Sequence, residues 1–341
     1  MRNIQNNTTV MAYDGAIARA FHSYSKISNR KAFDGSLNPI TSDSVDGVLL
    51  DLDMNYEMSK QPIRVLNPDG ISDPFIDDTN RGVVARDLIT GQFEYTKKVV
   101  GDGFTFTQND QIIESLLNLQ RTGLISLNLG GQFDIHTKCF IHATVGDEYM
   151  IGNDAHWRGL LFKWAHDGSS ALSCRAGTTR LGCLNEVPSF GQAWFSIKHT
   201  KSAEVKMAAL EGMVVEAIAG LDEYDKVMAK LMDMKIDDDQ FIEYNNTLHP
   251  IPKVIDHTPE YALTPGQKRS LTMVRNKRAA VRDVYFSSPT QENLYGTAAG
   301  AFHAAVEAFD HRFSGNRGAR ILGGTDTEYK RNAQALALSL I

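Results

Sequence analysis

The chain has 341 residues, of which 42% are hydrophobic and 22% are charged, as in ordinary globular proteins. No apolar run approaches the roughly 20 residues of a membrane-spanning helix, so no membrane partner is expected. The N-terminal residues lack the apolar stretch of a signal peptide, and the three cysteines form no CxxC motif. We therefore expect a cytoplasmic protein with free, buried thiols. The net charge of −6 argues against a protein that coats nucleic acid through bulk charge alone.

Three stretches are predicted along the chain. Residues 1–45 are polar and lack a sustained period, which predicts an N-terminal arm. Residues 46–250 are expected to form an α+β core, and residues 251–341 a helical C-terminal region. Within the core, Leu50 to Met58 alternates strictly between apolar and polar residues, which predicts a half-buried strand.

A hairpin and a helix are predicted next. Residues 82–100 have the pattern of two strands joined at Thr90-Gly91. Thr107 to Asp110 is typical of a helix N-terminus. The apolar residues of this helix are Ile112, Ile113, Leu116, Leu117 and Leu119.

Residues 124–235 are the most informative part, because they predict a β-β-β-α unit. Gly130-Gly131 and His166-Asp167-Gly168-Ser169 are typical of hairpin turns, since glycine accepts a positive φ. From Ser202 to Met234 apolar residues recur every three or four positions, which predicts one helix of about 33 residues, roughly 50 Å long. The predicted fold class is therefore α+β: an antiparallel curved sheet of β-hairpins backed by one long helix, with a helical C-terminal part.

The C-terminal region is predicted to form a series of helices. Asp237 to Asp239 predicts the start of a short helix that ends before Pro250, and a proline-rich connector containing Pro265 follows. Further helices are predicted over residues 267–285, 293–313 and 327–341, with a glycine-rich loop at residues 315–324 before the last one.

Motifs for nucleotide binding or ester hydrolysis are absent, and no cofactor is expected. The segment Gly315 to Arg320 contains two arginines, and it is interpreted either as a phosphate-binding loop or as a surface loop. His166 and Asp167, together with His199, indicate a possible metal-dependent hydrolase. The same Asp-Gly pair is also what a hairpin turn requires, so both interpretations stay open.

Basic residues come from neighbouring predicted strands and from the junction with the long helix. If they converge, the phosphates of a polynucleotide can follow a groove between the sheet and the helix; otherwise they are scattered surface charges. The candidate nucleic-acid-binding residues are Lys163, Arg175, Arg180, Lys198, His199 and Lys201.

Several motifs, in this order, resemble the signature of a family of phage and plasmid proteins, the domain of unknown function 932. They are Val83–Asp87, Phe106–Asn109, His166–Leu172, Thr179–Asn185, Ile197–Thr200 and Asn293–Thr297. The resemblance covers residues 80–340, and Ala299 and His303 depart from it. It implies a mobile-element protein in the bacterial cytoplasm and does not imply an activity.

The β-β-β-α order is also similar, at the level of fold, to single-strand annealing recombinases, whose protomers hold single-stranded DNA in a basic groove. This similarity implies a single-stranded DNA partner and a homo-oligomer. The leading hypothesis is a phage-type protein that binds and anneals single-stranded DNA in recombination or replication, without covalent chemistry. The alternatives are a metal-dependent hydrolase that uses His166, Asp167 and His199, and a self-assembling structural or host-interaction phage protein.

Overall fold

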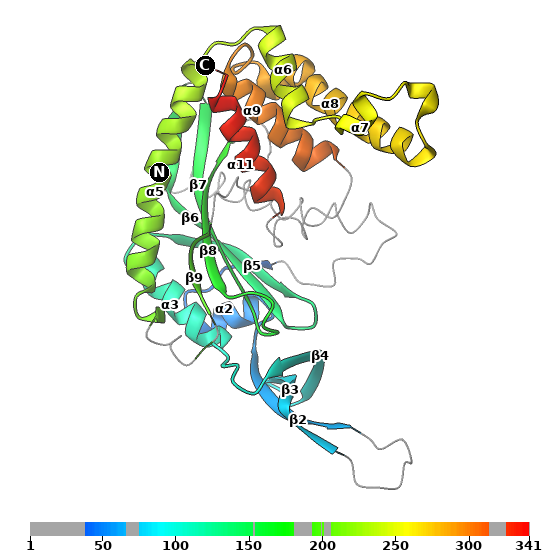
Figure 1. Cartoon of the computed structure of the whole chain (residues 1–341). Helices are drawn as coiled ribbons and strands as arrows, with labels where there is room; N and C mark the ends of the chain where they lie inside the picture. Colours follow the sequence, from blue (N-terminus) through cyan, green and yellow to red (C-terminus); the bar gives the residue numbers. More distant parts are fainter. Residues whose placement is uncertain are drawn as a thin grey trace. The chain divides into compact units, whose positions relative to one another are not determined.

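The computed structural model describes residues 38–65, 75–152, 154–180, 193–198, 200, 206–313 and 325–340; Figure 1 shows the chain in sequence colours. Contacts divide the chain into two compact units, each described here by itself. Unit 1 comprises Met1–Asp147, Arg158–Gly177 and Gln192–Gly220, and unit 2 comprises Glu148–Trp157, Thr178–Gly191 and Leu221–Ile341. The predicted boundaries at residues 45 and 250 stay predictions.

Within the described residues, the larger sheet has six strands in the order β1-β5-β6-β7-β8-β9. The pairs β1–β5, β5–β6 and β8–β9 are antiparallel. The strands are β1 (Asn38–Pro39), β5 (Ser126–Phe133), β6 (Lys138–Ile151), β7 (Asp154–Ala165), β8 (Leu172–Arg180) and β9 (Ala193–Ile197). The predicted α+β class with antiparallel sheets is confirmed.

The predicted turn at Gly130-Gly131 is wrong, because both glycines lie inside strand β5. A Cβ atom on Gly130 would lie 2.7 Å from the carbonyl oxygen of Phe140 and 2.9 Å from Cδ1 of Leu52. Neighbouring backbone and core atoms therefore occupy the space that a side chain would need. Gly130 is required for close packing of the strand, and it does not mark a turn.

The chain turns three residues later, at Asp134, Ile135 and His136. All three have positive φ, between 51° and 63°. Side chains close the turn: the His136 amide donates to Oε1 of Gln132 (3.0 Å), and the Thr137 hydroxyl donates to the carbonyl of Asp134 (2.6 Å). The hydroxyl of Tyr56 also donates to the carbonyl of His136 (2.9 Å). These local and long-range bonds hold a conformation that non-glycine residues rarely adopt.

The middle of the larger sheet has one more hairpin than predicted, because β6 and β7 replace a single predicted strand. The chain reverses between them near Gly152, whose φ is +59°. The predicted Asp-Gly turn between β7 and β8 is confirmed. Gly168 has a φ of +76°, and Oδ1 of Asp167 accepts the Ser169 amide at 2.9 Å.

Residues 50–58 do not form the single strand that was predicted. Helix α2 (Val45–Asp51) covers the first part, with Ser44 as its N-cap, and β2 begins only at Tyr56. Asp53, at a φ of +58°, lies between helix and strand. Leu50, the first apolar residue of the alternation, is 56% exposed. The alternation was misleading because a helix end followed by a turn also buries alternate residues.

The smaller sheet has the strand order β2-β3-β4 and confirms the predicted hairpin. Its strands are β2 (Tyr56–Val65), β3 (Phe75–Asp87) and β4 (Phe93–Gly101). Asp87 holds the turn, since its Oδ1 accepts the amides of Ile89 (2.9 Å) and Thr90 (2.7 Å).

Helix α3 (Asn109–Arg121) is also confirmed, and all five apolar residues predicted for it are buried. Its start is fixed by Gln108, which forms a capping box with Gln111. The Gln108 side chain also pairs with the amide and the carbonyl of Met58, each at 2.9 Å. The helix start is therefore attached to strand β2.

The C-terminal part is helical, as predicted. The long helix is α5 (Leu210–Asp233), with 24 residues instead of about 33, because Ala208 and Ala209 form a turn before it. It is followed by α6 (Asp238–Leu248), α7 (Lys253–Asp256), η2 (Glu260–Ala262), α8 (Pro265–Ser287), η3 (Pro289–Gln291), α9 (Ala298–Glu307), the π-helix η4 (Ala308–Arg312) and α11 (Thr325–Leu338). Pro265 belongs to α8 instead of the connector, because the first turn of a helix tolerates proline. None of the described helices combines the length and the apolar character needed to cross a membrane.

Two features organise unit 2. Helix α9 is buried along its whole length and contacts α6, α8 and α11. Asp225 of α5 accepts hydrogen bonds from the hydroxyls of Tyr149 in β6 (2.6 Å) and Thr178 in β8 (3.1 Å). Within this unit, the long helix is thereby attached to the strands.

Candidate nucleic-acid interface

Two of the predicted basic residues lie on neighbouring strands of the larger sheet. Arg175 belongs to β8, and Lys198 directly follows β9. Ser173 of β8 lies opposite Ser196 of β9. Arg175 is two residues from Ser173 along β8, so alternation places it on the side of Ser173, and the register of the pair shifts between Cys174 and Arg175. Lys198 is two residues from Ser196, one position past the end of β9. Measured along the strands, the two cations are about 13 Å apart.

The two cations differ in exposure, since Arg175 is half-buried and Lys198 is exposed. Lys163 is also half-buried, in β7, between the buried residues Phe162 and Trp164. The Arg180 side chain, His199 and Lys201 lie outside the described residues. The single continuous track predicted for all six residues stays a prediction.

His166 belongs to a buried hydrogen-bond network around Asn109. Oδ1 of Asn109 lies 3.0 Å from Nε1 of Trp164 and 2.9 Å from Nε2 of His166. This oxygen can only accept, so both ring nitrogens donate to it. The amide nitrogen of Asn109 donates to the carbonyl of Met54 (3.2 Å). Two sequence motifs, one ending at Asn109 and one starting at His166, therefore meet in the core of unit 1.

The neighbouring Asp167 holds its hairpin turn and lies 3.8 Å from the ammonium group of Lys98. Among the residues that the structure describes, no group of three His, Cys, Asp or Glu is arranged to hold a metal ion. His199 lies outside the described residues, so the hydrolase alternative stays a prediction.

Cys139 and Cys174 are free thiols and are buried, as expected, while Cys183 lies outside the described part. Burial raises the pKa of the Cys139 thiol to about 12 and raises the pKa of Cys174 as well. A thiolate is therefore disfavoured at either position at neutral pH, which argues against nucleophilic chemistry there.

A cavity of about 470 Å³ in unit 1 lies beside the turn of the β3–β4 hairpin. Its titratable lining is mostly acidic and consists of Asp53, Tyr56, Asp87, Glu94 and His136. Glu94 Oε2 lies 3.1 Å from His136 Nε2. Three carboxylates repel phosphates, so the cavity itself is not part of the candidate interface. Phe93 also lines the cavity and is 64% exposed.

The sequence analysis missed an exposed apolar surface on the smaller sheet. Phe93, Tyr95 and Val99 of β4 are 64%, 53% and 47% exposed, whereas Thr96 and Val83 on the opposite side are buried. The signal was present, because these three residues alternate along the strand. We call this surface the outer face; by register it comprises Glu57, Ser59, Gln61, Gly82, Val84, Arg86, Phe93, Tyr95 and Val99.

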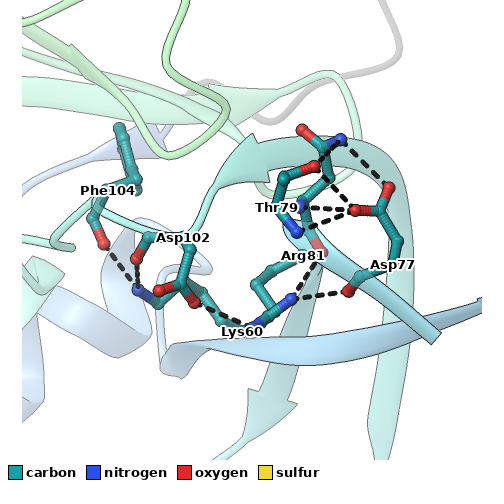
Figure 2. Close-up of polar contacts among 7 residues, drawn as sticks. Lys60, Asp77, Thr79, Arg81, Asp102 and Phe104 are labelled. Carbon is teal, nitrogen blue, oxygen red and sulfur yellow. Dashed lines mark hydrogen bonds and ion pairs between the residues drawn. The ribbon is translucent and has the colours of Figure 1, made fainter.

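Two other cations of the smaller sheet serve its own structure (Figure 2). Lys60 donates to the carbonyls of Asp102 (2.5 Å) and Phe104 (2.9 Å). Arg81 donates to the carbonyl of Asp77 (2.7 Å) and forms an ion pair with Asp102 (3.1 Å). Hydrogen bonds that the Asp77 carboxylate accepts from the next turn, chiefly from Asn80, lower its pKa well below the usual range.

These features define an α+β protein whose larger antiparallel sheet carries cations on adjacent strands. The chain belongs to the family described as domain of unknown function (DUF932), whose model matches residues 97–336. This match confirms the family resemblance, although the first motif, Val83–Asp87, precedes the matched residues. Strands β2 and β3 precede the matched residues. No curated protein and no solved structure matches the chain.

Proposed function

We propose that the protein binds single-stranded DNA and anneals complementary strands, without covalent chemistry. The observation that supports this proposal is the position of Arg175 in β8 and of Lys198 directly after the neighbouring strand β9. Two cations about 13 Å apart on a sheet can pair with separate phosphates of one strand. Binding of this kind neutralises phosphates and leaves the base edges free to pair.

The setting is part of the same proposal. We propose a phage or plasmid protein that acts in recombination or replication in the bacterial cytoplasm, as the resemblance of its motifs implies. Annealing proteins of this type work as assemblies, so a homo-oligomer is expected. Light scattering after gel filtration, with and without an oligonucleotide, measures the mass of the assembly. A monomer under both conditions would contradict the proposed homo-oligomer.

Fluorescence anisotropy of a labelled 30-nucleotide poly-dT strand tests binding. Between 50 and 200 mM salt, the logarithm of the affinity should fall with the logarithm of the salt concentration, by about 0.7 per phosphate contact. The double variant Arg175→Gln/Lys198→Gln removes two contacts and should reduce this slope by about 1.4. Lys253→Gln, which changes an exposed lysine of α7, is the matched control and should keep the wild-type slope.

Two results oppose the proposal. Absence of wild-type binding at 50 mM salt would overturn it. A double variant with the wild-type slope would remove Arg175 and Lys198 from the interface. Because Arg175 is half-buried, the exposed Lys198→Gln variant is measured alone as well, and it should reduce the slope by about 0.7.

Annealing is tested separately, with two complementary strands that carry a fluorescence donor and acceptor. The wild-type protein should accelerate their pairing above the spontaneous rate. Binding without acceleration would leave a single-stranded DNA-binding protein and remove annealing from the proposal.

A further inference from the structure

We infer that the outer face of the smaller sheet is a stacking platform for unpaired bases of single-stranded DNA, with Phe93 and Tyr95 as the stacking residues. This inference rests on the proposed function and adds a second contact with a different chemistry. The larger sheet supplies phosphate pairing, whereas the outer face supplies aromatic rings.

Tyr95 presents a flat, accessible ring. Tyr95 lies opposite Val84, next to Gly82, which has no side chain. A Cβ atom on Gly82 would lie 3.3 Å from Cε2 of Tyr95, so the ring rests against the bare backbone of the central strand. The side chain is nevertheless 53% exposed. One side of the ring is therefore supported by the sheet and the other remains accessible, as base stacking requires.

Phe93 is two residues away, is 64% exposed and also lines the acidic cavity beside the hairpin turn. The attachment points of the two rings are about 6.8 Å apart, twice the 3.4 Å rise of a stacked strand, so they can contact separate bases. Arg86 faces Phe93 across the β3–β4 pair, and its guanidinium carbon lies 6.0 Å from the ring centroid. A guanidinium beside an exposed ring can pair with a phosphate while a base stacks on that ring.

The outer face carries no net negative charge. By register it holds Arg86 and Glu57, whose side chains lie 3.8 Å apart. Lys97 is exposed in β4 at a point where the register of β3 and β4 shifts, and its φ is +63°, so the strand pairing does not assign it to either face. The sheet is anchored by its own polar network, in which Lys60 and Arg81 are engaged (Figure 2). The platform is thus fixed before binding, and less entropy is lost when a strand binds.

The experiment uses the full chain and an oligonucleotide that contains 2-aminopurine, whose fluorescence falls when the base stacks. Wild-type protein should quench this fluorescence. The variant Phe93→Ala/Tyr95→Ala should bind about tenfold or more weakly per ring removed and should lose the quenching, while the salt slope stays unchanged. The conservative variant Phe93→Tyr/Tyr95→Phe should restore both signals. Tyr261→Ala, which removes an 87% exposed ring of unit 2, is the control and should bind as wild type does.

The outcomes separate this inference from the proposed function. If wild-type protein does not bind at 50 mM salt, the proposed function fails, and this inference fails with it. If wild-type protein binds and Phe93→Ala/Tyr95→Ala binds equally well with full quenching, only the platform is overturned. A third outcome also overturns it: the double variant keeps DNA binding but changes the mass of the assembly, which would make the outer face a contact between copies of the chain.

Discussion

At the scale of single residues, the motif residues Gln108, Asn109 and His166 act in the core. Asn109 is 1% exposed and joins three parts of unit 1 through its side-chain amide. Gln108 connects the start of α3 to strand β2. A polar motif therefore does not by itself mark a reactive site, because a buried amide that satisfies several partners explains these residues.

The Asn109→Leu variant tests this structural role. Leucine has a similar volume but leaves the ring N–H groups of Trp164 and His166 without their acceptor, at a cost of about 1–3 kcal/mol for each buried donor. We expect the free energy of unfolding in urea to fall by about 2–4 kcal/mol. Asn118→Leu makes the same change at an exposed position of α3 and should alter it by less than about 0.5 kcal/mol. If the two variants lowered the free energy of unfolding equally, the structural role of the hydrogen-bond network around Asn109 would be contradicted.

At the scale of elements, close packing decides where strand β5 ends. Gly130-Gly131 has the composition of a turn, yet Gly130 lies where the carbonyl of Phe140 and the side chain of Leu52 leave no space for a Cβ atom. The turn forms instead at three non-glycine residues, because local bonds to Gln132 and Asp134 and a tertiary bond from the Tyr56 hydroxyl to the His136 carbonyl hold it. Packing of the strands overrides the local preference of the sequence.

Gly130→Ala should therefore destabilise the protein, by about 1–3 kcal/mol or more, since the added methyl group overpacks a strand pair. Gly101→Ala adds the same group at the end of β4, where nothing lies within 4 Å of the new atom, and should have little effect. Urea unfolding of both variants measures the difference. A Gly130→Ala protein as stable as Gly101→Ala would show that the strands have room to adjust.

At the scale of the whole molecule, each unit contains a buried histidine that resists protonation. In unit 1, burial lowers the pKa of His142 from 6.5 to about 3. In unit 2, burial lowers the pKa of His249 to about 4, with smaller contributions from Lys277 and Arg278. Between pH 6.5 and about 4, the unfolded chain binds protons that the folded chain does not bind. Folding is therefore favoured less as the pH falls through this range.

The free energy of unfolding should be lower at pH 5.5 than at pH 7.5, by about 1 kcal/mol for each of these histidines. Urea unfolding at the two pH values measures this change. His249→Gln removes one of the two histidines and should reduce the difference in unfolding free energy between the two pH values by about 1 kcal/mol. His257→Gln changes an exposed position and should leave this difference unchanged. A wild-type protein whose stability does not fall between pH 7.5 and 5.5 would contradict the prediction.

The candidate site was only partly predictable. Arg175 and Lys198 were named from the sequence because basic residues near predicted strands are visible in it, but their neighbourhood follows from the pairing of β8 with β9. The outer face was missed, because the alternation of Phe93, Tyr95 and Val99 does not say which face of the hairpin is covered. The opposite face, with Val83 and Thr96, is the buried one.

Local chemistry was enough to predict helix α3 with its apolar stripe, the hairpin that turns at Asp87 to Gly91, and the helical C-terminal part. Periodicity and turn composition act over a few residues, so they can be read directly from the chain. Long-range packing decided that Gly130 belongs to a strand, that the larger sheet gains a hairpin at Gly152, and which strands bring Phe93, Tyr95 and Arg86 together. These outcomes depend on atoms that are distant in sequence and compete for the same space.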